Sequence, residues 1–217
     1  MSILGGMMKR LAFALLVSMA FVGSAAHAKK EKPQPVFQDS VSQELPPPPA
    51  DKAQIVLIEP INKIQGLFPV AHYVLNGTER KMVAVSAWRS KTVFNLEPGK
   101  HMLMATQGFL GHPMEANVEA GKRYYVLVRF IYAQGMQLRP LRTSGNSPYR
   151  TDIPDFAEWW KITRYVEMTP AAVPTFESEK SKPTIDAAQA AMMVKWQEKT
   201  DAQRAELMLN TTDAIPL

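Results

Sequence analysis

Short apolar segments rich in β-branched residues, each ended by turn residues, follow one another through the middle of this chain. The clearest run from Ala53 to Glu59, from Val70 to Leu75 and from Arg123 to Tyr132. Asn76-Gly77 is a strong hairpin signal, because both residues tolerate the positive φ angles of a two-residue turn. Turn-bounded strands without helices between them are typical of an antiparallel sandwich or barrel. We expect five further strands, over 80–87, 91–96, 101–106, 137–142 and 162–168.

The fold class predicted from this pattern is mainly β, an antiparallel β-sandwich of about seven or eight strands over residues 52–170. The stretch from Arg123 to Tyr132 is apolar on both of its faces, which is typical of a strand covered on both sides. A linker over 171–183 should then lead into a C-terminal helix.

The C-terminal helix is expected over 184–210, with a possible break near residue 200 where Thr200 and Gln203 have the form of a capping box. Ile185, Met192 and Trp196 recur at helical spacing and should form its buried stripe. We expect this stripe to pack on the outer face of the strand that carries Tyr125, Leu127 and Ile131, since that face is too apolar to be left in water.

The N-terminus has the pattern of a secretory signal peptide over residues 1–28. Lys9 and Arg10 form a basic region, Leu11 to Val22 is apolar, and Ala26-His27-Ala28 predicts cleavage between Ala28 and Lys29. The apolar run is about a dozen residues, whereas a membrane-spanning helix needs roughly 20, so an uncleaved anchor is the weaker alternative. The expected location is therefore periplasmic or secreted, with membrane association at most peripheral.

The chain contains no cysteine, which excludes a lipoprotein signal, disulfides and thiol chemistry. Residues 29–51 are rich in proline, including Pro33, Pro35 and the run from Pro46 to Pro49. Because such a composition buries little apolar surface, we expect a disordered linker that is dispensable for folding.

Three features between Ala53 and Arg142 match a known family. These are the opening Ala-Gln-Ile-Val-Leu-Ile, the turn from Leu96 to His101, and the strand entry from Ala120 to Tyr125. The span resembles the bacterial domain-of-unknown-function 2846 family. The resemblance implies an exported β-sandwich with a transthyretin-like or carboxypeptidase-regulatory-like fold, and it supplies no catalytic residues. Many members of that family carry a lipid anchor, from which this chain departs because it lacks the cysteine.

The search for catalytic chemistry is largely negative. His72, His101 and His112 are too scattered for a histidine metal motif, and no GxSxG or phosphate-binding glycine loop is present. We therefore expect no metal, no cofactor and no enzymatic activity. A triad of residues distant in sequence remains an open alternative.

Two kinds of candidate binding residue remain. The apolar tip from Gln107 to Met114 could present a contact surface or fold inward over the core. Exposed tryptophans could stack on sugar rings or lie at a lipid interface, although lids on the core are the commoner role of such side chains. The candidates are Phe109, Leu110 and His112 at the tip, and Trp88, Arg89, Trp159 and Trp160 elsewhere.

The charge is mild: the formal net charge is +5, and removal of Lys9 and Arg10 with the leader leaves 25 − 2 − 20 = +3. This disfavours nucleic acid as a partner and leaves anionic lipid or cell-wall polymer as a target, or no target beyond solubility. The expected function is a non-catalytic binding or structural module of the cell envelope, with an unknown protein, glycan or lipid partner. The alternative is a hydrolase of an envelope polymer, or a carbohydrate-binding protein that uses surface tryptophans.

Overall fold

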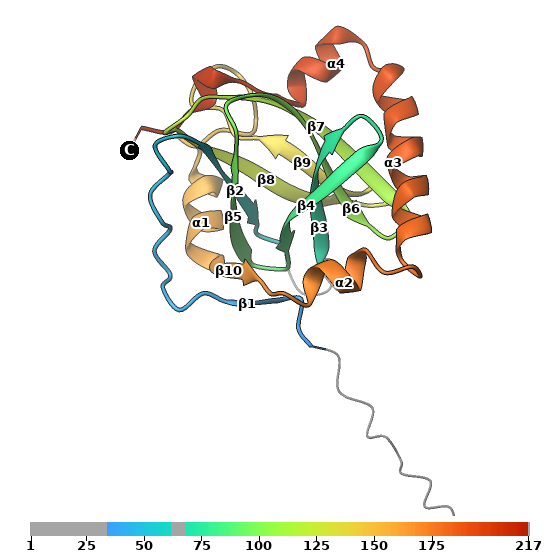
Figure 1. Cartoon of the computed structure of the whole chain (residues 1–217). Coiled ribbons are helices and arrows are strands. Elements are labelled where there is room, and N and C mark those ends of the chain that lie inside the picture. The colour runs from blue at the N-terminus through green and yellow to red at the C-terminus, as the bar shows by residue number, and fades with distance from the viewer. Residues whose placement is uncertain (1–33, 62–67, 217) are drawn as a thin grey trace, which may run out of the picture. The chain divides into compact units, whose positions relative to one another are not determined.

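The structure is a computed structural model that describes residues 34–61 and 68–216, and this part of the chain is mainly β. One sheet has six strands in the order β1-β10-β5-β2-β8-β9, and the other has five in the order β11-β7-β6-β3-β4 (Figure 1). The strands are β1 (Phe37–Asp39), β2 (Ala53–Glu59), β3 (Val70–Asn76), β4 (Glu79–Ser86), β5 (Ser90–Leu96), β6 (Gly99–Gln107), β7 (Leu110–Val118), β8 (Arg123–Ile131), β9 (Gly135–Pro140), β10 (Arg164–Met168) and β11 (Met208–Leu209).

The main core is formed by side chains of both sheets. Alternate residues of β2, including Ile55 and Leu57, pack with Leu103 of β6, Met114 of β7 and Tyr124 of β8. This follows from the period of two in a strand, which sends every second side chain to the same face. The prediction of a mainly β fold is confirmed.

The sheets are mixed rather than antiparallel, which corrects the expected topology. β2 pairs in parallel with β8, β10 with β5, and β11 with β7. The expected strand number was also too low, because β1 and β11 have only three and two residues, and β7 contains Gly111, Pro113 and Asn117. These residue types are depleted in strands, so the alternating pattern of β7 is weak.

The predicted disorder over 29–51 is wrong for residues 34–51. β1 pairs antiparallel with β10, and Gln43 exchanges hydrogen bonds with the backbone of Tyr165. The carbonyl of Pro46 accepts hydrogen bonds from Gln54 Nε2 at 3.0 Å and from Arg123 Nη2 at 2.6 Å. A proline lacks the N–H but keeps its acceptor, so polar side chains of the sheet can hold this segment.

Residues 29–33 and the predicted signal peptide over 1–28 lie outside the described residues. Within the described ranges, no helix has the length and apolar character needed to cross a membrane.

The C-terminal region contains more elements than one broken helix. α2 (Ala172–Phe176) occupies part of the expected linker over 171–183, and α3 (Lys182–Gln197) is followed by α4 (Asp201–Glu206). The capping box is confirmed, since Thr200 and Gln203 bond each other's backbone N–H groups at the start of α4. The expected end at residue 210 is wrong, because the chain leaves α4 at Glu206 and enters β11.

The predicted docking face of this helix is also wrong. Ile185 and Met192 of α3 pack on Tyr73 of β3 and Met104 of β6, which lie on the outer face of the five-stranded sheet. Tyr125 and Leu127 belong to a different cluster.

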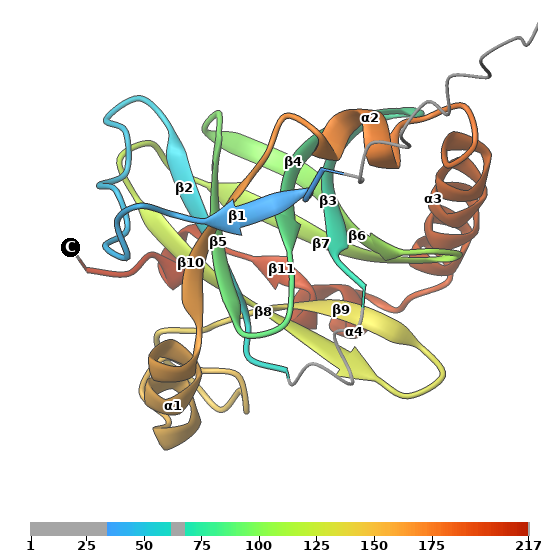
Figure 2. The same cartoon turned by 90° about the horizontal axis from the view of Figure 1, so that it is seen from below.

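That cluster is covered by α1 (Pro154–Ile162), whose Phe156 and Trp160 pack against Tyr125. The two helices lie on opposite sides of the molecule (Figure 2). Both sheets have an apolar outer face, and helical periodicity alone does not say which helix covers which.

We predict that Met192→Ala lowers the free energy of unfolding by about 3 kcal/mol, because it leaves a cavity under α3 against the outer face of the sheet. Urea unfolding measures this. Val194→Ala is the matched control on the same helix, since Val194 is 57% exposed and its loss should change stability by less than about 0.5 kcal/mol. Equal effects of the two substitutions would contradict the docking of α3.

Candidate functional site

The structure distributes the predicted binding residues over three places. Trp88 and Arg89 form the turn between β4 and β5, where Arg89 has a φ of 50°. Trp159 and Trp160 lie in α1. Phe109, Leu110 and His112 lie at the hairpin between β6 and β7, where Leu110 and His112 belong to the strand β7. No single surface therefore collects all of them.

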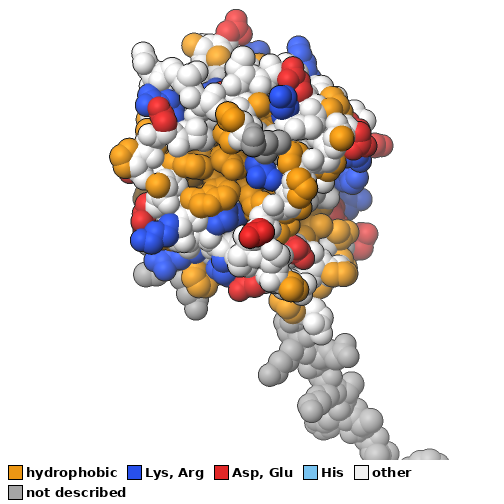
Figure 3. All heavy atoms as spheres, turned by 90° about the vertical axis from the view of Figure 1, so that its left-hand side faces the viewer, with side chains coloured by type: hydrophobic (Ala, Val, Ile, Leu, Met, Phe, Trp, Pro, Cys, Tyr) orange, Lys and Arg blue, Asp and Glu red, His pale blue; other side chains and the backbone are white. Residues whose placement is uncertain are grey.

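The tryptophans of the first two places are engaged in packing. The ring centroid of Trp160 lies 5.3 Å from that of Tyr125, and the Lys91 ammonium lies 4.7 Å from the Trp160 centroid. The Arg164 guanidinium lies 5.0 Å from the Trp88 ring centroid. Trp159 is half-buried in the same cluster as Trp160. Hydrophobic side chains gather on the face of the molecule that carries α1 (Figure 3).

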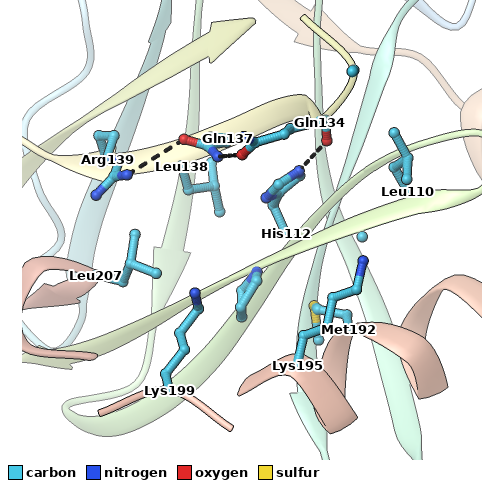
Figure 4. Close-up of a pocket in the computed structure, with 13 residues that line it drawn as sticks. Leu110, His112, Gln134, Gln137, Leu138, Arg139, Met192, Lys195, Lys199 and Leu207 are labelled. Atoms are coloured by element: carbon cyan, nitrogen blue, oxygen red, sulfur yellow. Dashed lines mark hydrogen bonds between the residues drawn. The ribbon is translucent and has the colours of Figure 1, made fainter. Parts of the chain in front are cut away.

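The third place opens into a cavity of about 270 Å³ between β7, β9 and the C-terminal part of α3. Gln134, Gln137 and Arg139 stand on one side, Lys195 and Lys199 on the other, with His112 between them (Figure 4). Its apolar lining comes from Leu110, Pro113, Ala133, Leu138, Met192 and Leu207, with Gly111 completing the wall.

The lining of this cavity is strongly basic. Its thirteen residues include Arg139, Lys195 and Lys199 and no Asp or Glu. Within the described ranges, neither lysine has a carboxylate within 4.0 Å. Lys195 is in the last turn of α3, where the negative end of the helix dipole offsets part of this uncompensated charge.

Arg139 is poorly satisfied as a hydrogen-bond donor. Its Nη1 reaches Glu206 and its Nη2 reaches Gln137, both at the long distance of 3.5 Å. Its Nε is buried and has no acceptor among the described residues. Since Glu206 is 74% exposed, that ion pair is weak. The guanidinium therefore keeps donors for an anion in the cavity.

His112 contributes a neutral polar group to the cavity. Its Nε2 lies 2.5 Å from the carbonyl oxygen of Gln134, which can only accept, so Nε2 carries the proton. Burial lowers the pKa of His112; its bond to Gln134 opposes this, and the charges of Lys195, Lys199 and Arg139 lower the pKa further. Gln137 Nε2 donates to Gln134 Oε1 at 3.0 Å and continues this polar wall.

Of the residues that line this cavity, the sequence predicted Leu110 and His112 as binding candidates but not the cations. Lys195 lies in the last turn of α3, three residues after the buried Met192, and Lys199 lies two residues beyond the end of that helix at Gln197. Gln137 and Arg139 are two apart and share one face of β9. Both spacings are visible in the sequence, but nothing in it indicates that α3 and β9 flank the same cavity.

A second polar cluster is buried between the sheets. Ser86 Oγ donates to Glu59 Oε2 at 2.5 Å, and His72 Nε2 lies 2.7 Å from Ser86 Oγ. Glu59 Oε1 and His72 Nδ1 are buried without a partner among the described residues. The serine lies between the acid and the histidine, whereas a nucleophile triad needs the histidine in the middle. These three residues do not line the cavity described above, and their arrangement is that of a polar link between β2, β3 and β4.

Burial shifts both titratable members of this cluster toward their neutral forms. It raises the pKa of Glu59 from 4.5 to about 8, against the opposing hydrogen bond from Ser86, and lowers the pKa of His72 from 6.5 to about 3. His101 lies apart from His72, with its Nε2 2.7 Å from the carbonyl of Glu97.

No family model matches the chain, and the search of curated proteins finds no match. Membership of the domain-of-unknown-function 2846 family stays a prediction.

We predict that stability falls between pH 6.5 and pH 8 because of Glu59. Its raised pKa means that the folded state holds a proton that the unfolded state has released, so its contribution is complete below pH 4.5 and is lost as the pH rises to about 8. His72 acts in the opposite sense: its contribution is complete above pH 6.5 and is lost as the pH falls toward 3. Between pH 4.5 and 6.5 the two slopes oppose each other.

The measurement is the free energy of unfolding at both ends of the upper window. The wild type should lose about 1 kcal/mol per pH unit there, and Glu59→Gln, which cannot ionise, should lose much less. Glu158→Gln, at an exposed position of α1, is the matched control and should behave as the wild type. A Glu59→Gln profile parallel to that of the wild type would refute the buried neutral carboxyl.

Proposed function

We propose that this protein is a non-catalytic binding module of the bacterial cell envelope, and that it binds a small anionic ligand in the cavity between β7, β9 and α3. The observation that carries the proposal is the convergence of Arg139, Lys195 and Lys199 on one cavity whose lining contains no carboxylate. Phosphate and carboxylate groups are the chemical classes that such donors recognise.

The groups around the cavity favour binding over hydrolysis. His112 is the one lining residue suited to act as a base near neutral pH, and no serine, threonine, aspartate or glutamate stands beside it in the lining. The apolar residues Leu138, Met192 and Leu207 lower the polarity of the walls, which strengthens each charge interaction inside. Ligand pockets are usually lined by apolar side chains with a few polar or charged groups that orient the ligand, as in this cavity.

The alternative, carbohydrate binding through surface tryptophans, has less support. Sugar stacking needs an accessible ring face, and the Trp160 ring packs on Tyr125 and has the Lys91 ammonium 4.7 Å from its centroid. This favours the role of α1 as a lid on the sheet.

Calorimetric titration with inorganic phosphate and with ethyl phosphate tests the proposal. We expect binding that weakens as salt is added, and a loss of about tenfold or more in the double variant Lys195→Gln, Lys199→Gln, because two charges that face the anion are removed. Glu206→Gln should tighten binding, since it frees Arg139 from its only carboxylate partner within the described ranges.

Lys180→Gln is the matched control, since Lys180 is exposed and lies before the opposite end of α3. It should leave the affinity unchanged. Equal affinity of the wild type and the double variant would exclude this cavity as the anion site.

The envelope location rests on the leader pattern of residues 1–28. We expect cell fractionation to recover a chain that begins at Lys29 in the periplasm or the medium, and mass spectrometry of its N-terminus to identify the cleavage. A full-length chain recovered from the cytoplasm would contradict this part of the proposal.

A further inference from the structure

An apolar groove lies beside the proposed anion cavity. It has a volume of about 640 Å³ and runs between the tip of the β6–β7 hairpin, α2 and the segments that enter β1 and β3. Phe68 and Phe109, which line it, are 63% and 82% exposed. Its other apolar walls are Val36, Pro69, Leu110 and Phe176.

Exposed apolar residues that are scattered singly need no explanation, but these side chains line a single hollow. Two phenylalanine rings left in water forgo a large burial energy. The sequence left open that the hairpin tip folds inward over the core. Phe109 does not do so, because its side chain is exposed to solvent.

Leu110 joins the groove to the cavity, because it lines both. Gly135, at the start of β9, lies close to Leu110: its φ is +84°, and a Cβ atom on it would lie 3.0 Å from Leu110 Cδ1. A larger residue at 135 would displace Leu110. The groove on one side of Leu110 is apolar, and the cavity on the other side is cationic.

We infer that the ligand is a single-chain lipid with an anionic head group. The head would lie among Arg139, Lys195 and Lys199, and the alkyl chain would pass Leu110 into the groove lined by Phe68 and Phe109. This rests on the proposed function and adds the class of ligand. The cations of the cavity favour an anionic head group. Because Leu110 lines both hollows, an alkyl chain attached to that head group can enter the groove.

The physical consequence is that affinity depends on chain length. Each methylene group removed from water contributes a three- to fourfold gain in affinity, or about 0.8 kcal/mol. A short alkyl phosphate should use the cavity alone, and a longer one should use both hollows.

The experiment compares ethyl phosphate with octyl phosphate by calorimetry, below the concentration at which octyl phosphate forms micelles. We expect octyl phosphate to bind the wild type at least about tenfold more tightly. The double variant Phe68→Ser, Phe109→Ser should lose this gain and keep the affinity for ethyl phosphate, which also shows that it is folded. Tyr132→Ser is the matched control, because Tyr132 is 88% exposed and lines neither hollow.

Each of the following results would overturn the inference. Equal affinities for the two phosphates in the wild type would reject the lipid chain and leave anion binding intact. A gain that persists in the double phenylalanine variant would place the chain elsewhere. Sedimentation of the wild type as a dimer and of that variant as a monomer would assign the groove to a second copy. If neither phosphate binds, the proposed function itself fails.

Discussion

The strand β2 is buried along its whole length and on both faces, and the rest of the architecture follows from covering it. Its neighbours β5 and β8 satisfy its backbone on either edge. Ile55 and Leu57 face the second sheet, while Val56 and Ile58 face outward and need a separate cover. Without a covering layer on each face, the apolar side chains of this strand would be exposed to water. The fold therefore needs one layer on either side of β2.

The two polar residues of β2 show how that burial is tolerated. Gln54 bonds the carbonyl of Pro46 and accepts from Arg123 Nε at 2.6 Å, which ties the N-terminal segment to the sheet. Glu59 is the last residue of the strand, and it is connected by hydrogen bonds to Ser86 and, through Ser86, to His72. This polar series links the two sheets at the edge of the apolar core. Buried polar groups with incomplete hydrogen bonding destabilise a protein, most of all when they are charged. Burial accordingly favours the neutral forms of Glu59 and His72.

Helix placement on the outer faces creates the candidate site. α3 docks on β3 and β6 through Ile185 and Met192, and bidentate pairing of Arg80 with Glu177, together with its contact to Asp186, holds α2 and α3 to β4. Arg142 fixes the returning chain by bonds to the carbonyls of Met208 and Ala205 and to Asp213. The end of α3 is thereby held over β7 and β9, where Lys195 of α3 and Lys199, which follows the helix, line the same cavity as Arg139.

The sequence by itself determined the strands with strong alternation and clear turns, such as β2, β3 and β8, the cap at Thr200, and the mainly β class. These depend on neighbouring residues, through side-chain period and turn geometry. It also proposed Leu110 and His112 as binding residues, and both line the cavity in the structure. It did not reveal β7 in full, because Gly111 and Pro113 weaken its pattern, nor the order formed by the proline-rich segment over 34–51.

Only the tertiary structure decided what depends on residues far apart in the chain. β2 pairs in parallel with β8, α1 rather than α3 covers Tyr125, and Pro46 becomes an acceptor for Arg123. The cationic cavity is likewise decided by tertiary structure. Arg139 and Lys195 come from separate elements, and the local pattern of one carries no information about the position of the other. Two apolar sheet faces and two amphipathic helices allow more than one pairing, and the choice between them is made by packing and chain connectivity, which a local sequence pattern does not contain.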